Sequence, residues 1–376
     1  MATTIVALKE LAEGERRVAL TPETARKFRS AGAAVAIEAG IGTGSHFPDS
    51  TYEGVAILDA SAAPARADVL LCVQPPGAEV LKGLRPGSVV VGMLAPHRGD
   101  DRIRLMRERG VSAFSMELLP RTTRAQSMDV LSSQAGMAGY KAMLIAATLA
   151  PRFFPMLTTA AGTIRPSKVL VIGAGVAGLQ AIATARRLGA QVEGFDVRPE
   201  TREQIQSLGA RFLDLGVSAA GEGGYARELT AEERQAQQDR LAEHLRGIDV
   251  VVTTAAVPGR AAPRILTAAM VGGMKAGSVV VDLAAESGGN CELTRPGETV
   301  VHGGVSIDGP TGLASMGSVH ASEMYARNLF NFVSLMLRDG ELEIDFDDDL
   351  VAGSCLVHDG RIHHAATRER LGEADR

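Results

Sequence analysis

The sequence predicts an α/β protein with two doubly wound domains, each built on a parallel sheet. Short runs of β-branched residues alternate with helical patterns along the 376 residues, which is typical of this class. The order of the runs also repeats, since segments 32–38, 67–77 and 86–91 resemble segments 189–192, 248–259 and 276–281 in turn. We therefore expect two similar domains, joined by long helices, with a cleft between them.

Bulk composition indicates an ordinary globular protein. Hydrophobic residues make up 45% and charged residues 22% of the chain, and the net charge is −5 without a basic block, which argues against a nucleic-acid partner. We expect no signal peptide, because residues 1–6 lack a basic region followed by a long apolar run. We expect no insertion into a membrane, because the longest uncharged run, 169–185, is interrupted by glycines. The three cysteines and eight histidines show no metal-ligand spacing, so we expect no metal site and a reduced, cytoplasmic compartment.

The first domain should begin with a strand over residues 3–8. Thr21 can then cap a helix that has Pro22 at its first position and Glu23 in its first turn. Further β-branched runs predict strands near residues 35, 69, 89 and 112. A helical pattern over 126–149 should lead into the second domain.

The second domain should end with a last strand over 299–302. A helix over 322–337 then crosses back, which places the C-terminal residues on the first domain. The acidic stretch 341–349 reads as a solvated turn, and the polar segment 218–238 as a long loop of the kind that is usually functional or disordered. The expected domains are thus 1–130 plus 320–376, and 131–319.

A dinucleotide-binding fingerprint opens the second domain. The apolar run 169–172 meets Gly173-x-Gly175-x-x-Gly178, and an alanine-rich helix follows; these glycines allow a tight turn, close approach of a pyrophosphate and close helix–strand packing. Only this half carries the glycine-rich loop, so we expect a Rossmann-like NAD(H) domain here. The first domain, also Rossmann-like in its strand pattern, should form one wall of the cleft without binding a nucleotide.

Asp196 points to NAD(H) rather than NADP(H). It ends the next strand, 18 residues past Gly178, close to the expected spacing of about 20. A carboxylate there can accept both ribose hydroxyls and repels a 2′-phosphate. The alternative is a structural glycine-rich turn with an unrelated surface acid. The expected cofactor contacts are Gly173, Ala174, Gly175, Val176, Ala177, Gly178, Asp196, Val197, Arg198, Ala255 and Ala256.

The segment 116–134, with its Arg-Ala-Gln-Ser-Met-Asp run, resembles the signature of a known family. It is similar to the NAD(H)-binding component, domain I, of proton-translocating NAD(P)+ transhydrogenase, a family related to alanine dehydrogenase. The resemblance extends over nearly the whole chain, including 160–163, 223–226, 285–291 and 326–329. It implies hydride transfer from NADH on this chain to NADP+ on a partner chain, coupled to proton translocation.

The resemblance also implies partners and a location. Because this chain has one fingerprint and no membrane span, a membrane-spanning subunit and an NADP(H)-binding subunit must come from other chains. We expect a homodimer that lies on the cytoplasmic side, peripheral to the inner (plasma) membrane.

Hydride transfer between two nicotinamides needs positioning groups rather than a nucleophile, a metal or a proton relay. By resemblance, Arg121, Gln126, Asp129 and Ser132 surround the nicotinamide and its ribose, and Tyr225 lies in a mobile loop that closes over NAD(H). The alternative for the first group is a helix cap made by Asp129 or Ser127, with Arg121 in a surface ion pair. The alternative for Tyr225 is an exposed loop tyrosine.

Two other function classes compete. An alanine dehydrogenase needs a lysine and a histidine near the third and fourth strands, where this sequence has Cys72 and Met93; Arg17 alone is kept. A non-catalytic NAD-binding module would not need the cluster from Arg121 to Ser132. The sequence also departs from the transhydrogenase pattern at Cys72 and over 308–319, so details there stay open.

Overall fold

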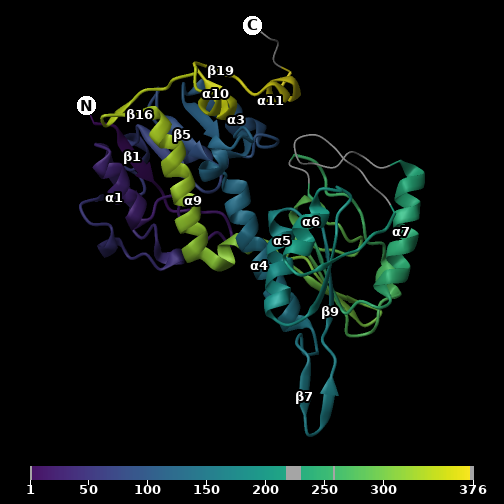
Figure 1. Cartoon of the computed structure of the whole chain (residues 1–376). Coiled ribbons are helices and arrows are strands. Elements are labelled where there is room, and N and C mark those ends of the chain that lie inside the picture. Colours follow the sequence, from purple (N-terminus) through teal and green to yellow (C-terminus); the bar gives the residue numbers. More distant parts are fainter. Residues whose placement is uncertain (1, 217–229, 257–258, 373–376) are drawn as a thin grey trace. The chain divides into compact units, whose positions relative to one another are not determined.

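The structure is a computed structural model that describes residues 2–216, 230–256 and 259–372 (Figure 1). It divides into two compact units: unit 1 comprises Met1–Gln134 and Ser315–Arg376, and unit 2 comprises Ala135–Ala314. Among the described residues, no helix has the length and apolar character needed to cross a bilayer.

Unit 1 is built on an eight-stranded sheet in the order β19-β18-β6-β5-β4-β1-β2-β3. Its parallel strands are β1 (Thr4–Ala7), β2 (Ala34–Glu38), β3 (Ala56–Leu58), β4 (Val69–Cys72), β5 (Val89–Gly92) and β6 (Ser112–Ser115). The antiparallel strands β18 (Cys355–His358) and β19 (Arg361–Ile362) extend one edge, so the C-terminal region of the chain completes this sheet.

Helices cover both faces of that sheet, because alternate strand residues point to opposite sides. Ile5 and Ala7 of β1 lie in one hydrophobic core, whereas Val6 lies in the other. The helices are α1 (Pro22–Ser30), α2 (Ala78–Gly83), α3 (Asp100–Glu108), α9 (Ser318–Val333), α10 (Asp349–Ser354) and α11 (Ala365–Arg370). A small antiparallel pair, β16 (Leu337–Arg338) and β17 (Glu341–Leu342), follows α9.

The start of α1 confirms the predicted cap. The Thr21 hydroxyl accepts the Thr24 N–H, and the Thr24 hydroxyl in turn accepts the Thr21 N–H. Both orphan donors are thereby satisfied, and Pro22 at the first position loses no hydrogen bond.

Four predicted segments differ from the structure. Residues 231–238 of the predicted loop 218–238 belong to the helix α7 (Ala231–Leu245), and residues 218–229 lie outside the described residues. The helical pattern 126–149 is two elements, the 3₁₀ turn η5 (Arg124–Met128) and α4 (Val130–Leu149), because Asp129 leaves the helical conformation and caps α4. The predicted last strand is followed by another, β15 (Val305–Asp308). The helix expected at 322–337 is α9, and a 3₁₀ turn at Ser334–Met336 follows it.

Unit 2 has a seven-stranded sheet in the order β11-β10-β9-β12-β13-β15-β14. All strands are parallel except β14; they are β9 (Lys168–Ile172), β10 (Gln191–Phe195), β11 (Arg211–Phe212), β12 (Val250–Thr253), β13 (Val279–Asp282), β14 (Thr299–His302) and β15. Its helices after α4 are α5 (Val176–Arg187), α6 (Thr201–Ser207), α7 (Ala231–Leu245) and α8 (Ala268–Gly272), and a hydrophobic core lies on each face.

A two-stranded hairpin projects from unit 2 (Figure 1). It consists of β7 (Leu157–Thr159) and β8 (Gly162–Ile164), and every residue of both strands is exposed. Met156, beside the hairpin, is 65% exposed, and Ile164 is 45% exposed. The hairpin therefore presents apolar side chains that unit 2 itself does not cover.

Candidate functional site

The glycine-rich turn of unit 2 joins β9 to α5. Gly173 adopts a φ of +96°, and a Cβ at Gly178 would lie only 1.8 Å from the Gly173 carbonyl oxygen. Both positions therefore require glycine for the turn itself. A Cβ at Gly175, in contrast, would meet no atom within 4 Å.

Gly175 thus has open space on the side where a side chain would stand. It is exposed and immediately precedes Val176, the first residue of α5, so the first amides of that helix lie beside it. Backbone amides at a helix N-terminus attract anions, and a missing side chain lets a phosphate approach them closely. The turn fits the pyrophosphate of a dinucleotide at this place.

Asp196 lies at the end of β10, directly beside the turn. Its carboxylate accepts the Ala174 N–H at 2.8 Å and the Arg198 N–H at 2.9 Å, and the Arg198 guanidinium binds both oxygens at 2.9 and 2.7 Å. Burial opposes ionisation, but these donors outweigh it and hold the pKa of Asp196 below its usual range. Asp196 is therefore an ionised acceptor beside the turn, and its charge would repel a second anion placed next to it.

Asn290 fixes the segment after β12. Its side-chain oxygen accepts the Ala255 N–H at 3.0 Å, and its amide donates to the carbonyls of Ala255 at 2.7 Å and Pro263 at 2.9 Å. Ala255 adjoins Gly173, since a Cβ on Gly173 would lie 3.3 Å from the Ala255 nitrogen. Asn290 belongs to the segment 285–291 that resembles the family, yet nothing in its spacing reveals this role.

The second group of predicted site residues lies in unit 1, around η5 and the start of α4. Arg121 and Gln126 are exposed, and Asp129 and Ser132 are half-buried. Asp129 accepts the Ser132 N–H at 2.9 Å and the Ser132 hydroxyl at 2.5 Å. Asp129 therefore caps α4, as the structural alternative anticipated, and the same contacts hold Ser132 in place. Tyr225 lies outside the described residues.

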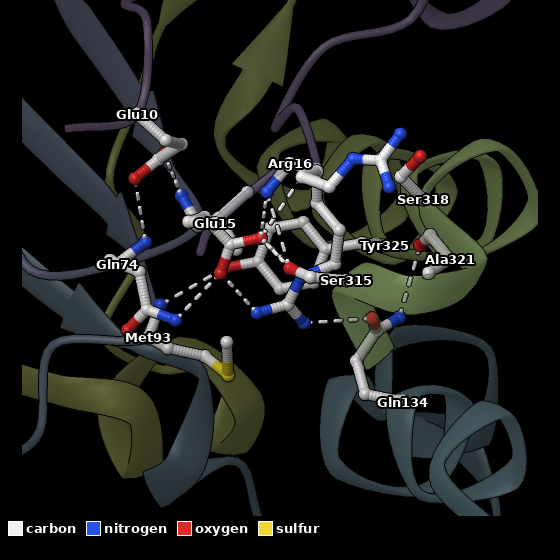
Figure 2. Close-up of polar contacts among 12 residues, drawn as sticks. Glu10, Glu15, Arg16, Gln74, Met93, Gln134, Ser315, Ser318, Ala321 and Tyr325 are labelled. Carbon is white, nitrogen blue, oxygen red and sulfur yellow. Dashed lines mark hydrogen bonds and ion pairs between the residues drawn. The ribbon is translucent and has the colours of Figure 1, made fainter. Parts of the chain in front are cut away.

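A buried polar cluster occupies the carboxyl edge of the unit 1 sheet (Figure 2). The Glu15 carboxylate pairs with the Arg17 guanidinium at 2.6 and 2.8 Å, and it accepts the Gln74 amide at 2.8 Å and the Ser315 hydroxyl at 2.5 Å. Arg17 also donates to the Gln134 oxygen at 2.9 Å. Burial opposes ionisation of Glu15, but Arg17 and the other donors lower its pKa to about 2.

Glu10 faces the same edge from the loop after β1. Its carboxylate accepts the backbone N–H groups of Val73 at 2.5 Å and Gln74 at 3.1 Å. Burial outweighs these bonds and raises the pKa of Glu10 to about 7. Sequence reasoning missed both acids, because single glutamates in a loop carry no recognisable spacing.

The ends of β4 and β5 carry no lysine or histidine; they read Cys72-Val73-Gln74-Pro75 and Gly92-Met93-Leu94-Ala95. Cys72 is buried, which raises the pKa of its thiol, and its carbonyl accepts the Tyr325 hydroxyl at 2.8 Å. That hydroxyl accepts the Met93 N–H at 3.1 Å. Within the unusual segment 308–319, Ser315 supplies the hydroxyl that binds Glu15.

Two protein-family models match the chain. The alanine dehydrogenase/PNT N-terminal domain covers residues 6–138, and the alanine dehydrogenase/PNT C-terminal domain covers residues 142–365.

Individual proteins agree with these matches. An NAD(P) transhydrogenase subunit alpha polypeptide of Rickettsia prowazekii (strain Madrid E) is 41% identical over 97% of both chains. The crystal structure of transhydrogenase from Sinorhizobium meliloti has a TM-score of 0.87 and 46% identity, and the match covers 95% of this chain and 99% of that one. The alanine dehydrogenase of Halomonas elongata is 28% identical over 97% of this chain and 95% of its own length.

Proposed function

Since this chain belongs to the alanine dehydrogenase/PNT family, we propose that it is the NAD(H)-binding component of a proton-translocating transhydrogenase. In this proposal, hydride passes directly from NADH on this chain to NADP+ on a partner chain. The observation that carries the proposal is the turn at Gly173–Gly178 with Asp196, together with strand ends in unit 1 that hold no acid–base pair.

Bound NAD(H) would supply the hydride, so the protein's contribution is binding and orientation. The backbone around Gly175 would hold the pyrophosphate, and Asp196 the adenosine ribose hydroxyls. The Gln126 amide has the donor and acceptor that pair with a carboxamide. Arg121, Asp129 and Ser132 would contact the nicotinamide and its ribose, and Tyr225 would close over the cofactor.

The Asp196–Arg198 pair supports NAD(H) over NADP(H). An arginine near this position can hold a 2′-phosphate in other enzymes. Here the Arg198 guanidinium donates to both carboxylate oxygens of Asp196. A 2′-phosphate that approached Arg198 would also face the ionised carboxylate of Asp196.

Alanine dehydrogenase is the alternative within the family. Its chemistry needs a base and cations for the substrate carboxylate. Arg17 is already paired with Glu15, and Cys72 and Met93 offer no charge. Glu10 is the one buried carboxyl near this edge with a pKa close to neutral among the described residues, but its oxygens hold two backbone N–H groups. The lower identity to alanine dehydrogenases agrees with the first choice.

The proposal includes partners. A membrane-spanning subunit and an NADP(H)-binding subunit would complete the enzyme, with this chain peripheral to the membrane on its cytoplasmic side. We also propose a homodimer, which the exposed apolar hairpin β7–β8 supports.

The test measures two reactions on one preparation: reduction of NADP+ by NADH, and oxidation of L-alanine by NAD+. The purified chain with NADH should reduce NADP+ only when the NADP(H)-binding component is added, and it should form no NADH from L-alanine and NAD+. NADH formation that depends on alanine, well above background, would replace the proposal with the dehydrogenase alternative.

A further inference from the structure

The 3₁₀ turn η5 carries Gln126 but has weak bonds of its own. The Gln126 N–H donates to the Thr123 carbonyl at 3.3 Å, and the Asp129 N–H donates to the Gln126 carbonyl at 3.4 Å. Both distances exceed the usual range for backbone hydrogen bonds. The side chain of Gln126 is exposed, so packing does not fix it either. Ala125 and Met128 of the turn are buried in the core of unit 1, so the position of Gln126 depends on that packing and on the polar bonds that neighbouring elements make to the turn.

Helix α9 supplies that support. Asn328 and Asn331 lie three residues apart, on the same side of the helix. Each donates its side-chain amide to the Ser127 carbonyl, at 2.8 and 2.9 Å respectively. Two donors on one carbonyl occupy both of its lone pairs.

Asn328 connects η5 to a further element, because it also forms a hydrogen bond with α4, which Asn331 is not shown to do. Its side-chain oxygen accepts the Ser133 hydroxyl at 2.7 Å, and its side chain is buried whereas Asn331 is half-buried. Exchanging the oxygen and nitrogen of Asn328 would set two carbonyl oxygens against each other at Ser127, so its orientation is fixed. One buried amide thus links η5, α4 and α9.

The bonds continue from Ser133 into the buried polar cluster of unit 1. The Gln134 amide donates to the Ser133 hydroxyl and to the Ala321 carbonyl of α9, each at 3.1 Å (Figure 2 shows the latter). Arg17 in turn donates to Gln134. Asn328 is therefore hydrogen-bonded to Ser133, which is itself connected to the buried residues Gln134 and Arg17.

A second polar interaction of η5, made by Arg124, is expected to stabilise the turn less than the asparagine bonds do. Arg124 forms ion pairs with Asp348 and Asp349, but its side chain is 49% exposed. Exposed ion pairs contribute little, because water screens them and long side chains lose freedom. Arg124 is thus a matched control at the other end of the same turn.

We propose that Asn328 is a positioning residue for the proposed hydride transfer, because it holds the turn that carries Gln126. The inference rests on the proposed function for its rate effect, while the anchoring itself is testable without catalysis.

The experiment uses the full chain with Asn328→Ala, Asn331→Ala and Arg124→Ala. Hydrogen exchange of the segment 122–130 is followed by mass spectrometry, NADH affinity by calorimetry, and single-turnover hydride transfer with the NADP(H)-binding component. Asn328→Ala should speed exchange of this segment and slow transfer roughly tenfold, since small misplacements are costly, with NADH affinity within about threefold. Arg124→Ala should change none of these, and Asn331→Ala should have a smaller effect.

A double variant links the effect to Gln126. If Asn328 acts through Gln126, adding Asn328→Ala to Gln126→Asn should slow transfer by less than about twofold more. If Asn328→Ala does not fold, Ser133→Ala removes the bridge to α4 with a smaller change and should shift exchange and rate in the same direction.

Three results would overturn the inference: unchanged exchange, faster exchange with an unchanged rate, or fully multiplicative slowing in the double variant. Failure of the proposed function is seen separately. It would appear as no NADP+ reduction by the wild-type chain together with the NADP(H)-binding component, and the exchange data would still decide the anchoring.

Discussion

At the scale of single residues, we propose that Asp196 selects NAD(H) over NADP(H). We expect the wild-type chain to bind NADH at least tenfold more tightly than NADPH, a difference of about 1.4 kcal/mol or more. The physical reason is that a 2′-phosphate would face an ionised carboxylate that is paired with Arg198. Calorimetry with both nucleotides measures the ratio.

Asp196→Ala should narrow that ratio by weakening NADH binding and removing the repulsion. Asp214→Ala, at an exposed acid of the same unit that pairs with Arg202, is the control and should leave both affinities unchanged. Equal affinities of the wild-type chain for NADH and NADPH would contradict the assignment of Asp196.

Glu10 should make stability depend on pH near neutrality. Burial raises its pKa to about 7 in the folded chain, above the unfolded value of 4.5. A raised pKa stabilises the fold fully below pH 4.5, and this contribution is lost as the pH rises through 7. The lost free energy of unfolding is roughly 3 kcal/mol at most.

The Glu10→Gln variant lacks this titration. It should therefore gain stability relative to wild type between pH 4.5 and 7.5, as measured by urea unfolding followed by circular dichroism. Glu13→Gln, at an exposed position of the same loop, should track wild type throughout. Parallel profiles for wild type and Glu10→Gln would show that Glu10 does not titrate in this range.

At the residue level, the sequence predicts which residues lie together where a residue type has a distinctive local pattern. The fingerprint glycines and Asp196 have fixed spacing, and the structure brings them together in unit 2. Glu10, Glu15, Asn290 and Asn328 act through partners distant in sequence, so no local pattern could reveal them.

At the scale of elements, Asp129 at the start of α4 can act as a helix cap alone or also contact the nicotinamide ribose. One pair of variants distinguishes these two roles. Asp129 caps the helix through Ser132, so Asp129→Ala should cost about 1 kcal/mol of stability. Asparagine caps as well as aspartate, so Asp129→Asn should stay within about 0.5 kcal/mol of wild type. Urea unfolding of the two variants measures both values.

If Asp129 were only a cap, Asp129→Asn would also keep the full rate of hydride transfer. We expect that rate to fall, because the proposed contact to the nicotinamide ribose uses a carboxylate. A stable variant with the wild-type rate would leave Asp129 with a structural role alone.

Every residue of the hairpin strands β7 and β8 is exposed, so unit 2 itself covers little of this element. Its exposed apolar residues support the proposed homodimer, because such surfaces usually mark contacts with another chain. Leu157→Asp combined with Ile164→Asp should convert a dimer to a monomer in sedimentation velocity. Val301→Asp, on the exposed edge strand β14, is the matched control and should leave the dimer intact. A wild-type monomer, or a dimer that survives the hairpin variant, would contradict the homodimer or this interface.

Element boundaries could be predicted where capping residues mark them, as at Thr21. They could not be predicted at Asp129, since the apolar pattern continues across the break, where the Asp129 cap begins α4. The strand β15 was missed because a tight turn at Gly303 and Gly304 joins it directly to β14.

At the scale of the whole molecule, the internal repeat in the sequence corresponds to a repeated sheet order. Unit 1 has β3-β2-β1-β4-β5-β6, and unit 2 has β11-β10-β9-β12-β13-β15 in the same sense. The repeated runs at Val35 and Val192, at Val69 and Val250, and at Val89 and Val279 fall on equivalent strands. Repetition of apolar runs thus predicted the architecture, because buried parallel strands read as continuous β-branched segments.

The two units differ at the point where strand order reverses, which is where such sheets bind ligands. In unit 2 this point has open backbone at Gly175. In unit 1 the Glu10 carboxylate occupies the amides after β4. This difference agrees with the proposal that unit 2 binds the dinucleotide.

Direct hydride transfer is tested most directly by an isotope label. NADH carrying deuterium at the transferred C4 position is mixed in a stopped-flow instrument with the wild-type chain, the NADP(H)-binding component and NADP+. We predict that the label appears in NADPH, with no exchange into water, and that the reaction is slower than with unlabelled NADH when the chemical step limits the rate. Label lost to solvent, or no labelled NADPH at all, would contradict direct transfer between two positioned nicotinamides.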